Sequence, residues 1–169
     1  MRRTGGQQRH TRAQRVVVGL GIAAAVVFTA ARARADLGPD EKRMLAEEAL
    51  KWAMDGGIAD VKLIKDSENI VVVNSDLPPK IELHVPGRKL TLLSALGIQA
   101  RADIHGDFLF FRLGPFVGDD KQAHVPIGLF WAVSLNSTMQ YLSGGGTVLD
   151  FEKRDGKWQL LPVTNKWMS

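Results

Sequence analysis

Three polar residues at alternating positions, Asp103, His105 and Asp107, are the candidate catalytic or metal-binding residues of this chain. On an extended segment they would share one face. Two carboxylates and an imidazole there could bind a divalent metal or orient the histidine as a base. The same residues also suit a solvated turn at Gly106, with both aspartates bonded to local backbone. A metal site needs further ligands that the sequence does not indicate, so we favour the turn and expect neither metal nor cofactor.

Two further polar patterns have an ordinary explanation beside the chemical one. Glu82 and His84 would share one face of a strand predicted over residues 81–85, as an acid–base pair or as a surface contact of small energy. His124 begins a long predicted strand on the face opposite its apolar residues, so we expect it to be exposed.

The glycine run 144–146 resembles a phosphate-binding loop only superficially. That loop requires Lys and then Ser or Thr after its last glycine, followed by a helix. Here Thr147 follows directly and a strand is predicted, so the glycines indicate a tight bend or bulge. The chain has no cysteine, which excludes thiol nucleophiles and thiolate metal sites.

Aromatic residues on neighbouring strand positions are the candidate binding residues. Phe110 and Phe111 are adjacent, as are Phe130 and Trp131, so each pair points to opposite faces of its strand. Unless both faces of the sheet are covered, some of these rings face outward. We take Phe110, Phe130 and Trp131 as the candidate site for a small apolar ligand, a protein partner or a second copy of the chain.

One amphipathic helix is predicted over residues 39–54. Pro39 suits the first helical position, and Asp40 and Glu41 suit the positive end of the helix dipole. Leu45, Ala49, Trp52 and Ala53 form an apolar stripe, and Gly56-Gly57 ends the helix. Such a one-sided helix needs a surface on which to pack.

The rest of the chain is predicted to be mostly strands. Residues 61–64 and 70–73 are expected to form a hairpin, and residues 81–85 and 90–93 to flank a turn at Pro86-Gly87. Ser94 is expected to cap a short second helix that runs to about Ala102. Strands then follow over residues 108–113, 125–135 (apolar at a period of two), 148–153 and 157–162.

The last two strands flank Asp155-Gly156, a strong hairpin signal, with Phe151 and Trp158 large enough to pair across it. The fold class is therefore α+β. The N-terminal amphipathic helix is expected to pack on a curved antiparallel sheet, with one short second helix.

Residues 144–158 resemble the final hairpin of cystatin-like or NTF2-like α+β domains, and the order of helix and strands over residues 40–169 is similar. This resemblance implies a cone-shaped pocket between helix and sheet. It implies no fixed activity, because members bind ligands, isomerise, inhibit or assemble. In the isomerases of that family a buried Asp is the base, but no motif assigns that role to a numbered residue here.

The first 35 residues have the pattern of a secretory signal. They contain seven arginines and no acid, an uncharged run over residues 16–31, and the small-x-small ending Ala33-Arg34-Ala35. At 16 residues the run is shorter than the roughly 20 that a spanning helix needs. We expect cleavage before Asp36 and an exported, periplasmic or secreted domain over residues 36–169. A retained anchor at residues 16–31 is the alternative.

The positive charge of the chain belongs to this leader. The chain has 22 basic and 18 acidic residues, and the leader holds seven of the basic ones, so residues 36–169 have a net charge of −3. Without a basic patch on the folded domain, nucleic-acid binding is not expected. Membrane contact is expected only if the leader stays attached.

Three functions remain open from the sequence. The first is a small exported binding or interaction protein without catalysis. The second is an NTF2-like pocket enzyme with a buried Asp or His. The third is a membrane-anchored domain that assists an envelope assembly.

Overall fold

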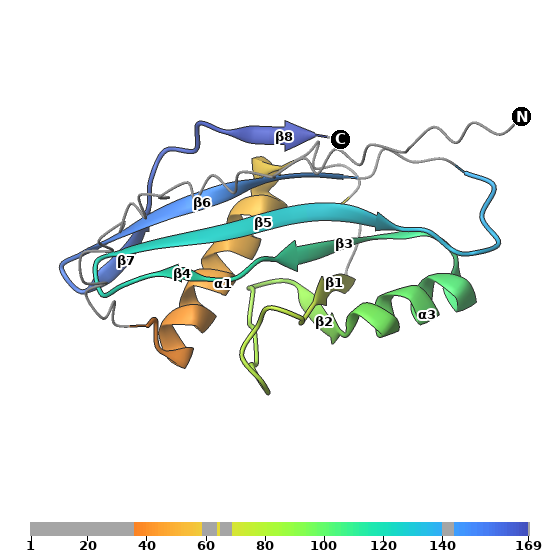
Figure 1. Cartoon of the computed structure of the whole chain (residues 1–169), viewed down its shortest axis with the longest axis horizontal. Coiled ribbons are helices and arrows are strands. Elements are labelled where there is room, and N and C mark those ends of the chain that lie inside the picture. The colour runs from red at the N-terminus through yellow and green to blue at the C-terminus, as the bar shows by residue number, and fades with distance from the viewer. Residues whose placement is uncertain (1–35, 59–63, 65–68, 140–143, 169) are drawn as a thin grey trace, which may run out of the picture. The chain divides into compact units, whose positions relative to one another are not determined.

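The computed structural model describes residues 36–58, 64, 69–139 and 144–168 (Figure 1), all within a unit that spans residues 33–169. The predicted leader, residues 1–35, lies outside the described residues. The elements in chain order are α1 (Pro39–Trp52), a wider helical turn η1 (Ala53–Gly57), β1 (Asn69–Val73), β2 (Lys89–Leu93), α3 (Ala95–His105), β3 (Phe108–Leu113), β4 (Val117–Gly118), β5 (Gln122–Ala132), β6 (Gly144–Arg154), β7 (Lys157–Leu160) and β8 (Lys166–Met168). Within the described part of the chain, we find no helix with the length and apolar character needed to cross a bilayer.

Helix α1 confirms the predicted amphipathic helix. Pro39 occupies its first position, and the backbone N–H of Gly38 donates to Glu41 Oε2 at 3.1 Å, which satisfies a free donor at the helix start. At the other end, η1 contains Gly56 with φ of 104°, a left-handed conformation that favours glycine and ends the helix.

The strands form one curved, mixed sheet in the order β2-β1-β3-β5-β6-β7. The prediction of an antiparallel sheet is correct from β3 onward and wrong for β1, which pairs parallel with both β2 and β3. The reason lies in the connections. Residues 74–88 join β1 to β2, and α3 joins β2 to β3, and crossovers of this kind bring the chain back to the end of the sheet where the previous strand began.

The neighbours of β1 also overturn the hairpin predicted between residues 61–64 and 70–73. Both edges of β1 are occupied by β2 and β3, and Ile64 is helical. Residues 61–63 lie outside the described residues. The strand predicted over residues 81–85 is likewise wrong: only Val85 pairs, in a single bridge to Arg88 around the Pro86-Gly87 turn.

Strand β5 is the long strand predicted from the alternation, but it ends at Ala132 and not at Leu135, which is 83% exposed. Strands β3 and β4 pair with it one after the other. Leu113 lies opposite Ile127 and Val117 opposite His124. The chain thus advances four residues from β3 to β4 while β5 advances three, so the β3–β4 side has one extra residue. This extra residue is a β-bulge. It lies beside Pro126, whose carbonyl accepts from the backbone N–H of Gly114 at 2.8 Å.

The C-terminal hairpin of β6 and β7 turns at Asp155 and Gly156, both with positive φ, as predicted. Its two-residue turn fixes the register so that Trp158 lies opposite Lys153 and Phe151 opposite Leu160. The predicted pairing of Phe151 with Trp158 is therefore wrong. Strand β8 then continues along the same edge of β6, opposite residues 145–147.

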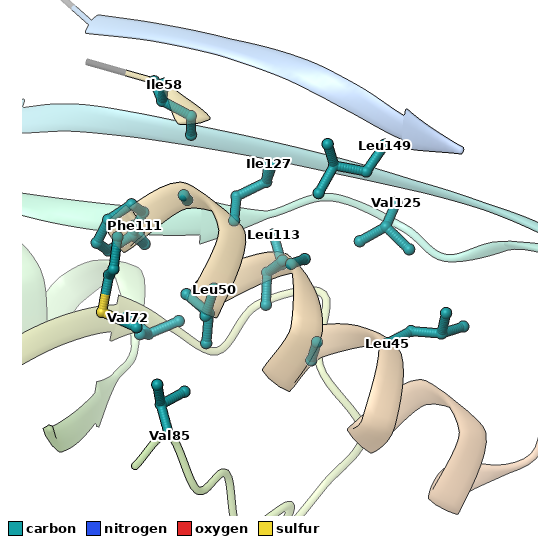
Figure 2. Packing of buried hydrophobic residues seen from close by; sticks show 14 of the residues in the cluster. Leu45, Leu50, Ile58, Val72, Val85, Phe111, Leu113, Val125, Ile127 and Leu149 are labelled. Atoms are coloured by element: carbon teal, nitrogen blue, oxygen red, sulfur yellow. The ribbon is translucent and has the colours of Figure 1, made fainter. Parts of the chain in front are cut away.

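The two helices are associated with two separate apolar clusters. Alternate residues of β3, β5 and β6, among them Phe111, Ile127 and Leu149, belong to the larger cluster, which also holds the apolar residues of α1 (Figure 2). We call this side of the sheet the α1 face. Ile98 and Ala102 of α3 form a smaller cluster with strand residues whose side chains point to the other side of the sheet: Val71, Val73, Ala132, Phe108 and Phe110. We call that side the α3 face.

Candidate functional site

The predicted trio Asp103, His105 and Asp107 does not lie on an extended segment, so its side chains do not share one face of a strand. Asp103 and His105 belong to the last turn of α3, and Gly106, with φ of 87°, separates them from Asp107. Side chains share a face about every 3.6 residues in a helix and every two residues in a strand, so helical residues two positions apart point in different directions. Within the described residues, no group of three or more His, Asp or Glu side chains is placed to hold a metal ion.

Both aspartates instead hold the loop that follows β5. Asp107 accepts from the backbone N–H of Ser134 at 2.7 Å and from Ser137 Oγ at 2.5 Å. Asp103 Oδ1 accepts from the N–H of Leu135 at 2.9 Å and from Gln99 Nε2 at 3.0 Å. These bonds turn residues 133–137 away from the sheet toward α3, which explains why β5 stops at Ala132.

Asp107 also lines a hollow of about 310 Å³ together with Trp131, Arg101 and Asn69. Each carboxylate oxygen of Asp107 already accepts a hydrogen bond from the loop, an arrangement that indicates a structural role.

The other polar candidates separate in space. Glu82 and His84 do not form a strand pair; the backbone N–H of His84 donates to Glu47 of α1 at 2.9 Å. His124 is exposed, as predicted, and its Nδ1 lies 2.6 Å from Asp150 Oδ1 on the neighbouring strand β6. A half-exposed pair of this kind contributes only about 0.2–1 kcal/mol.

The aromatic candidates divide between the two faces of the sheet. Phe110 of β3 and Phe130 of β5 are direct cross-strand partners on the α3 face, with ring centroids 5.9 Å apart. Trp131 follows Phe130 directly in β5, so its side chain points to the opposite face of the sheet. Of the three predicted binding residues, Phe110 and Phe130 are therefore in contact on one face of the sheet, and Trp131 lies on the other face.

Trp167 of β8 takes the third place in this stack. Its ring centroid lies 6.0 Å from that of Phe130, and 47% of the residue is exposed. We call Phe110, Phe130 and Trp167 the aromatic strip. Sequence reasoning missed Trp167 because nothing indicated that the chain after the last hairpin returns to the sheet as β8. An isolated tryptophan two residues before the last residue of the sequence was the available signal.

Glycines make room for the aromatic strip. A Cβ on Gly128 would lie 2.6 Å from the Phe130 ring, and one on Gly144 2.7 Å from the same ring. A Cβ on Gly146 would meet the Trp167 ring at 2.9 Å and the carbonyl of Ile127 at 2.6 Å. The glycine run that the sequence predicted to be a bend or bulge is therefore the floor on which two rings lie. Ser143, which precedes it, lies outside the described residues.

Two hollows flank Phe130 on the α3 face. The first, of about 450 Å³, lies between the sheet and α3 and is lined by Val73, Ser75, Ala95, Ile98, Phe110, Arg112, Phe130 and Trp131. The second, of about 250 Å³, lies toward β8 and is lined by Arg112, Gly114, Pro126, Ile127, Gly128, Phe130, Thr147, Val148 and Trp167. Arg112 and Phe130 belong to both, so the hollows are neighbours along one surface.

Strand β8 closes the far side of the second hollow and is fixed there by more than its ladder bonds. The buried hydroxyl of Thr147 donates to the carbonyl of Asn165, just before β8. Because Trp167 lies opposite Gly146 in the ladder, this attachment holds the indole over the glycine floor. The described structure therefore contains an apolar, ring-lined surface with one cationic side chain.

Comparisons with protein-family models, with curated proteins and with solved structures find no match to this chain.

Proposed function

We propose that this chain is a small exported binding protein without catalytic activity, and that the aromatic strip with its two hollows is the surface that takes its ligand or partner. The observation that carries the proposal is the stack of Phe110, Phe130 and Trp167 over a floor of glycines, on a face that α3 covers only in part.

The energetics of exposed rings support this use of the α3 face. Burial of apolar surface stabilises by about 25 cal/mol per Å², so a half-exposed Trp167 leaves binding energy available to a partner. Trp and Arg are enriched among residues that dominate binding energy, and both line the second hollow. Val148, which also lines it, is half exposed and adds apolar area.

We further propose that the fold is of the NTF2-like or cystatin-like kind. Supporting features are a helix on one face of a curved sheet and a C-terminal hairpin that carries the aspartate–glycine turn. The parallel pairs of β1 and the position of α3 on the other face go beyond the layout expected from the resemblance.

The proposed compartment rests on the leader. Basic residues, a short apolar run and a small-residue ending precede Asp36, and the net charge of −3 after it suits a domain that does not bind nucleic acid. Mass spectrometry of the protein recovered from cells is expected to give a chain that begins at Asp36. Recovery of the intact chain in the membrane fraction would favour the anchored alternative.

A pocket enzyme is supported less well. Such an enzyme would need Asp107 as its base in the 310 Å³ hollow, but both carboxylate oxygens of this residue accept hydrogen bonds from Ser134 and Ser137. Because both oxygens hold the loop that follows β5, this carboxylate is explained by a structural role without a catalytic one.

Binding of anilinonaphthalene sulfonate, a fluorescent apolar probe, tests the proposed surface. Trp167→Ala and Phe130→Leu are expected to weaken probe binding about tenfold, because each removes ring surface from the hollows. Leu96→Ala is the matched control, since it shortens an apolar side chain of α3 that is 84% exposed and lines neither hollow. Equal probe binding by all three variants and the original chain would refute the proposal.

A further inference from the structure

We infer that the ligand of the aromatic strip is an anionic amphiphile, a flexible apolar chain that ends in a carboxylate, with the carboxylate on Arg112, which the two hollows share, and the chain extending from it over Phe130 and Trp167. This inference rests on the proposed function and specifies its ligand class.

The position of Arg112 identifies the headgroup site. Of the described residues that line the two hollows, Arg112 alone is charged. It lies opposite Gly128 in the ladder between β3 and β5, so the residue directly opposite contributes no side chain of its own. Its side chain is 57% exposed. An apolar chain in the hollow beside Trp167 can therefore place a terminal carboxylate on this guanidinium.

The hydrogen bonding of Arg112 leaves capacity for a ligand. Among the described residues, Arg112 contacts the carboxylate of Asp76, at a distance of 3.4 Å from Nη2 to Oδ2. Strong charge-assisted hydrogen bonds of this type measure about 2.7–2.9 Å. A guanidinium has five N–H donors in a planar fork that fits a carboxylate with two parallel bonds. A ligand carboxylate therefore has donors available beside the Asp76 contact.

The geometry of the rings indicates an aliphatic chain as the apolar part. Phe110 and Phe130 are tilted by 33° and Phe130 and Trp167 by 46°, so the rings contact one another and do not form a flat platform. A flat sugar or aromatic ring needs an open ring face on which to stack. The remaining walls are mainly aliphatic, with Val73 and Ile98 on one side and Pro126 and Val148 on the other. A flexible chain can follow such a surface past Phe130.

Calorimetric titration of the full chain with decanoate and with decanol, both below the concentration at which they aggregate, tests the inference. The two probes share an apolar chain of equal length and differ in the charge of the headgroup. Arg112→Gln removes the cation from the hollows, and Trp167→Ala removes a ring. Arg43→Gln is the matched control, because Arg43 is an exposed arginine on α1 that lines neither hollow.

We expect decanoate to bind the original chain more tightly than decanol does. Arg112→Gln is expected to weaken decanoate binding about tenfold and to leave decanol binding unchanged, since one charge-assisted contact is lost. Trp167→Ala should weaken both probes, and Arg43→Gln neither. Because every variant retains residues 1–35, any binding to the apolar leader is common to all titrations.

Two different failures can be told apart. If decanol binds as tightly as decanoate, or if Arg112→Gln behaves like Arg43→Gln, the anionic headgroup is wrong while a Trp167→Ala effect still supports the proposed surface. If Trp167→Ala changes the binding of neither probe, the proposed surface itself is wrong. Circular dichroism of each variant verifies that the fold is retained.

Discussion

Glu41, in the first turn of α1, accepts a hydrogen bond of 2.7 Å from Lys153 Nζ near the end of β6, so the two residues join the first helix to the C-terminal hairpin. The same carboxylate accepts from the backbone N–H of Gly38 through its other oxygen. Lys153 Nζ also lies 5.3 Å from the centroid of the Trp158 ring. The contact therefore connects the start of the helix, the sheet and the hairpin.

The pH dependence of stability should report this contact. The hydrogen bond from Lys153, then that from Gly38, lowers the pKa of Glu41 below its ordinary value of 4.5. At a pH between the lower pKa of the folded chain and the ordinary value of 4.5, the unfolded chain binds more protons than the folded chain. The contribution of Glu41 to the free energy of unfolding is therefore complete above pH 4.5 and is lost as the pH falls through the lower folded pKa. Glu41→Gln is expected to cost about 1 kcal/mol at pH 7, measured by urea unfolding.

The difference between Glu41→Gln and the original chain should shrink as the pH falls below 4.5. Glu48→Gln, an exposed glutamate on the same helix, is the control and should match the original chain at neutral pH. A constant difference across the acidic range would mean that Glu41 contributes by packing and not by its charge.

Asp107→Ala should destabilise the protein by about 1–3 kcal/mol, because it leaves the Ser134 amide and the Ser137 hydroxyl without their acceptor. Hydrogen exchange should also accelerate in residues 134–137. Asp120→Ala, in an exposed turn, should change neither quantity. Slow exchange that persists at Ser134 in the Asp107 variant would contradict the structural role given to this carboxylate.

Gly146→Ala should destabilise by about 2 kcal/mol, since the added Cβ would lie 2.6 Å from the Ile127 carbonyl and 2.9 Å from the Trp167 ring. The neighbouring strands hold both groups in place. Gly87→Ala tests backbone conformation alone, because no atom lies within 4 Å of its Cβ position and only its φ of 74° is strained. Its cost should be about 1 kcal/mol. Thermal unfolding that ranks Gly87→Ala as the more damaging would refute the close packing of β6 beneath Trp167.

Leu50→Ala should cost about 3 kcal/mol, because Leu50 is fully buried between α1 and the sheet. Leu96→Ala removes the same atoms from an exposed position on α3 and should change stability by less than about 0.5 kcal/mol. Denaturant unfolding of the pair measures the difference directly. Similar losses in both variants would mean that α1 does not cover the sheet as described.

Local signals in the sequence determined the elements that depend on neighbouring residues. Pro39 and Gly56 bound the first helix, Ser94 caps the second by accepting from the Gly97 N–H, and Asp155-Gly156 sets the last hairpin. Each signal acts through backbone geometry within a few residues, so it keeps its meaning wherever the segment lies in the fold.

Tertiary structure alone decided the pairing of distant strands and the membership of the site. The parallel neighbours of β1 follow from long connections, whose path no local pattern specifies. Asp103 and Asp107 acquired their role from a loop about thirty residues away. Phe110 and Phe130 face one another because of strand register, and Trp167 joins them because β8 returns to an edge of β6 that has glycines in place of side chains. Periodicity tells which residues share a face of one strand, but which strands then lie side by side depends on contacts across the whole chain.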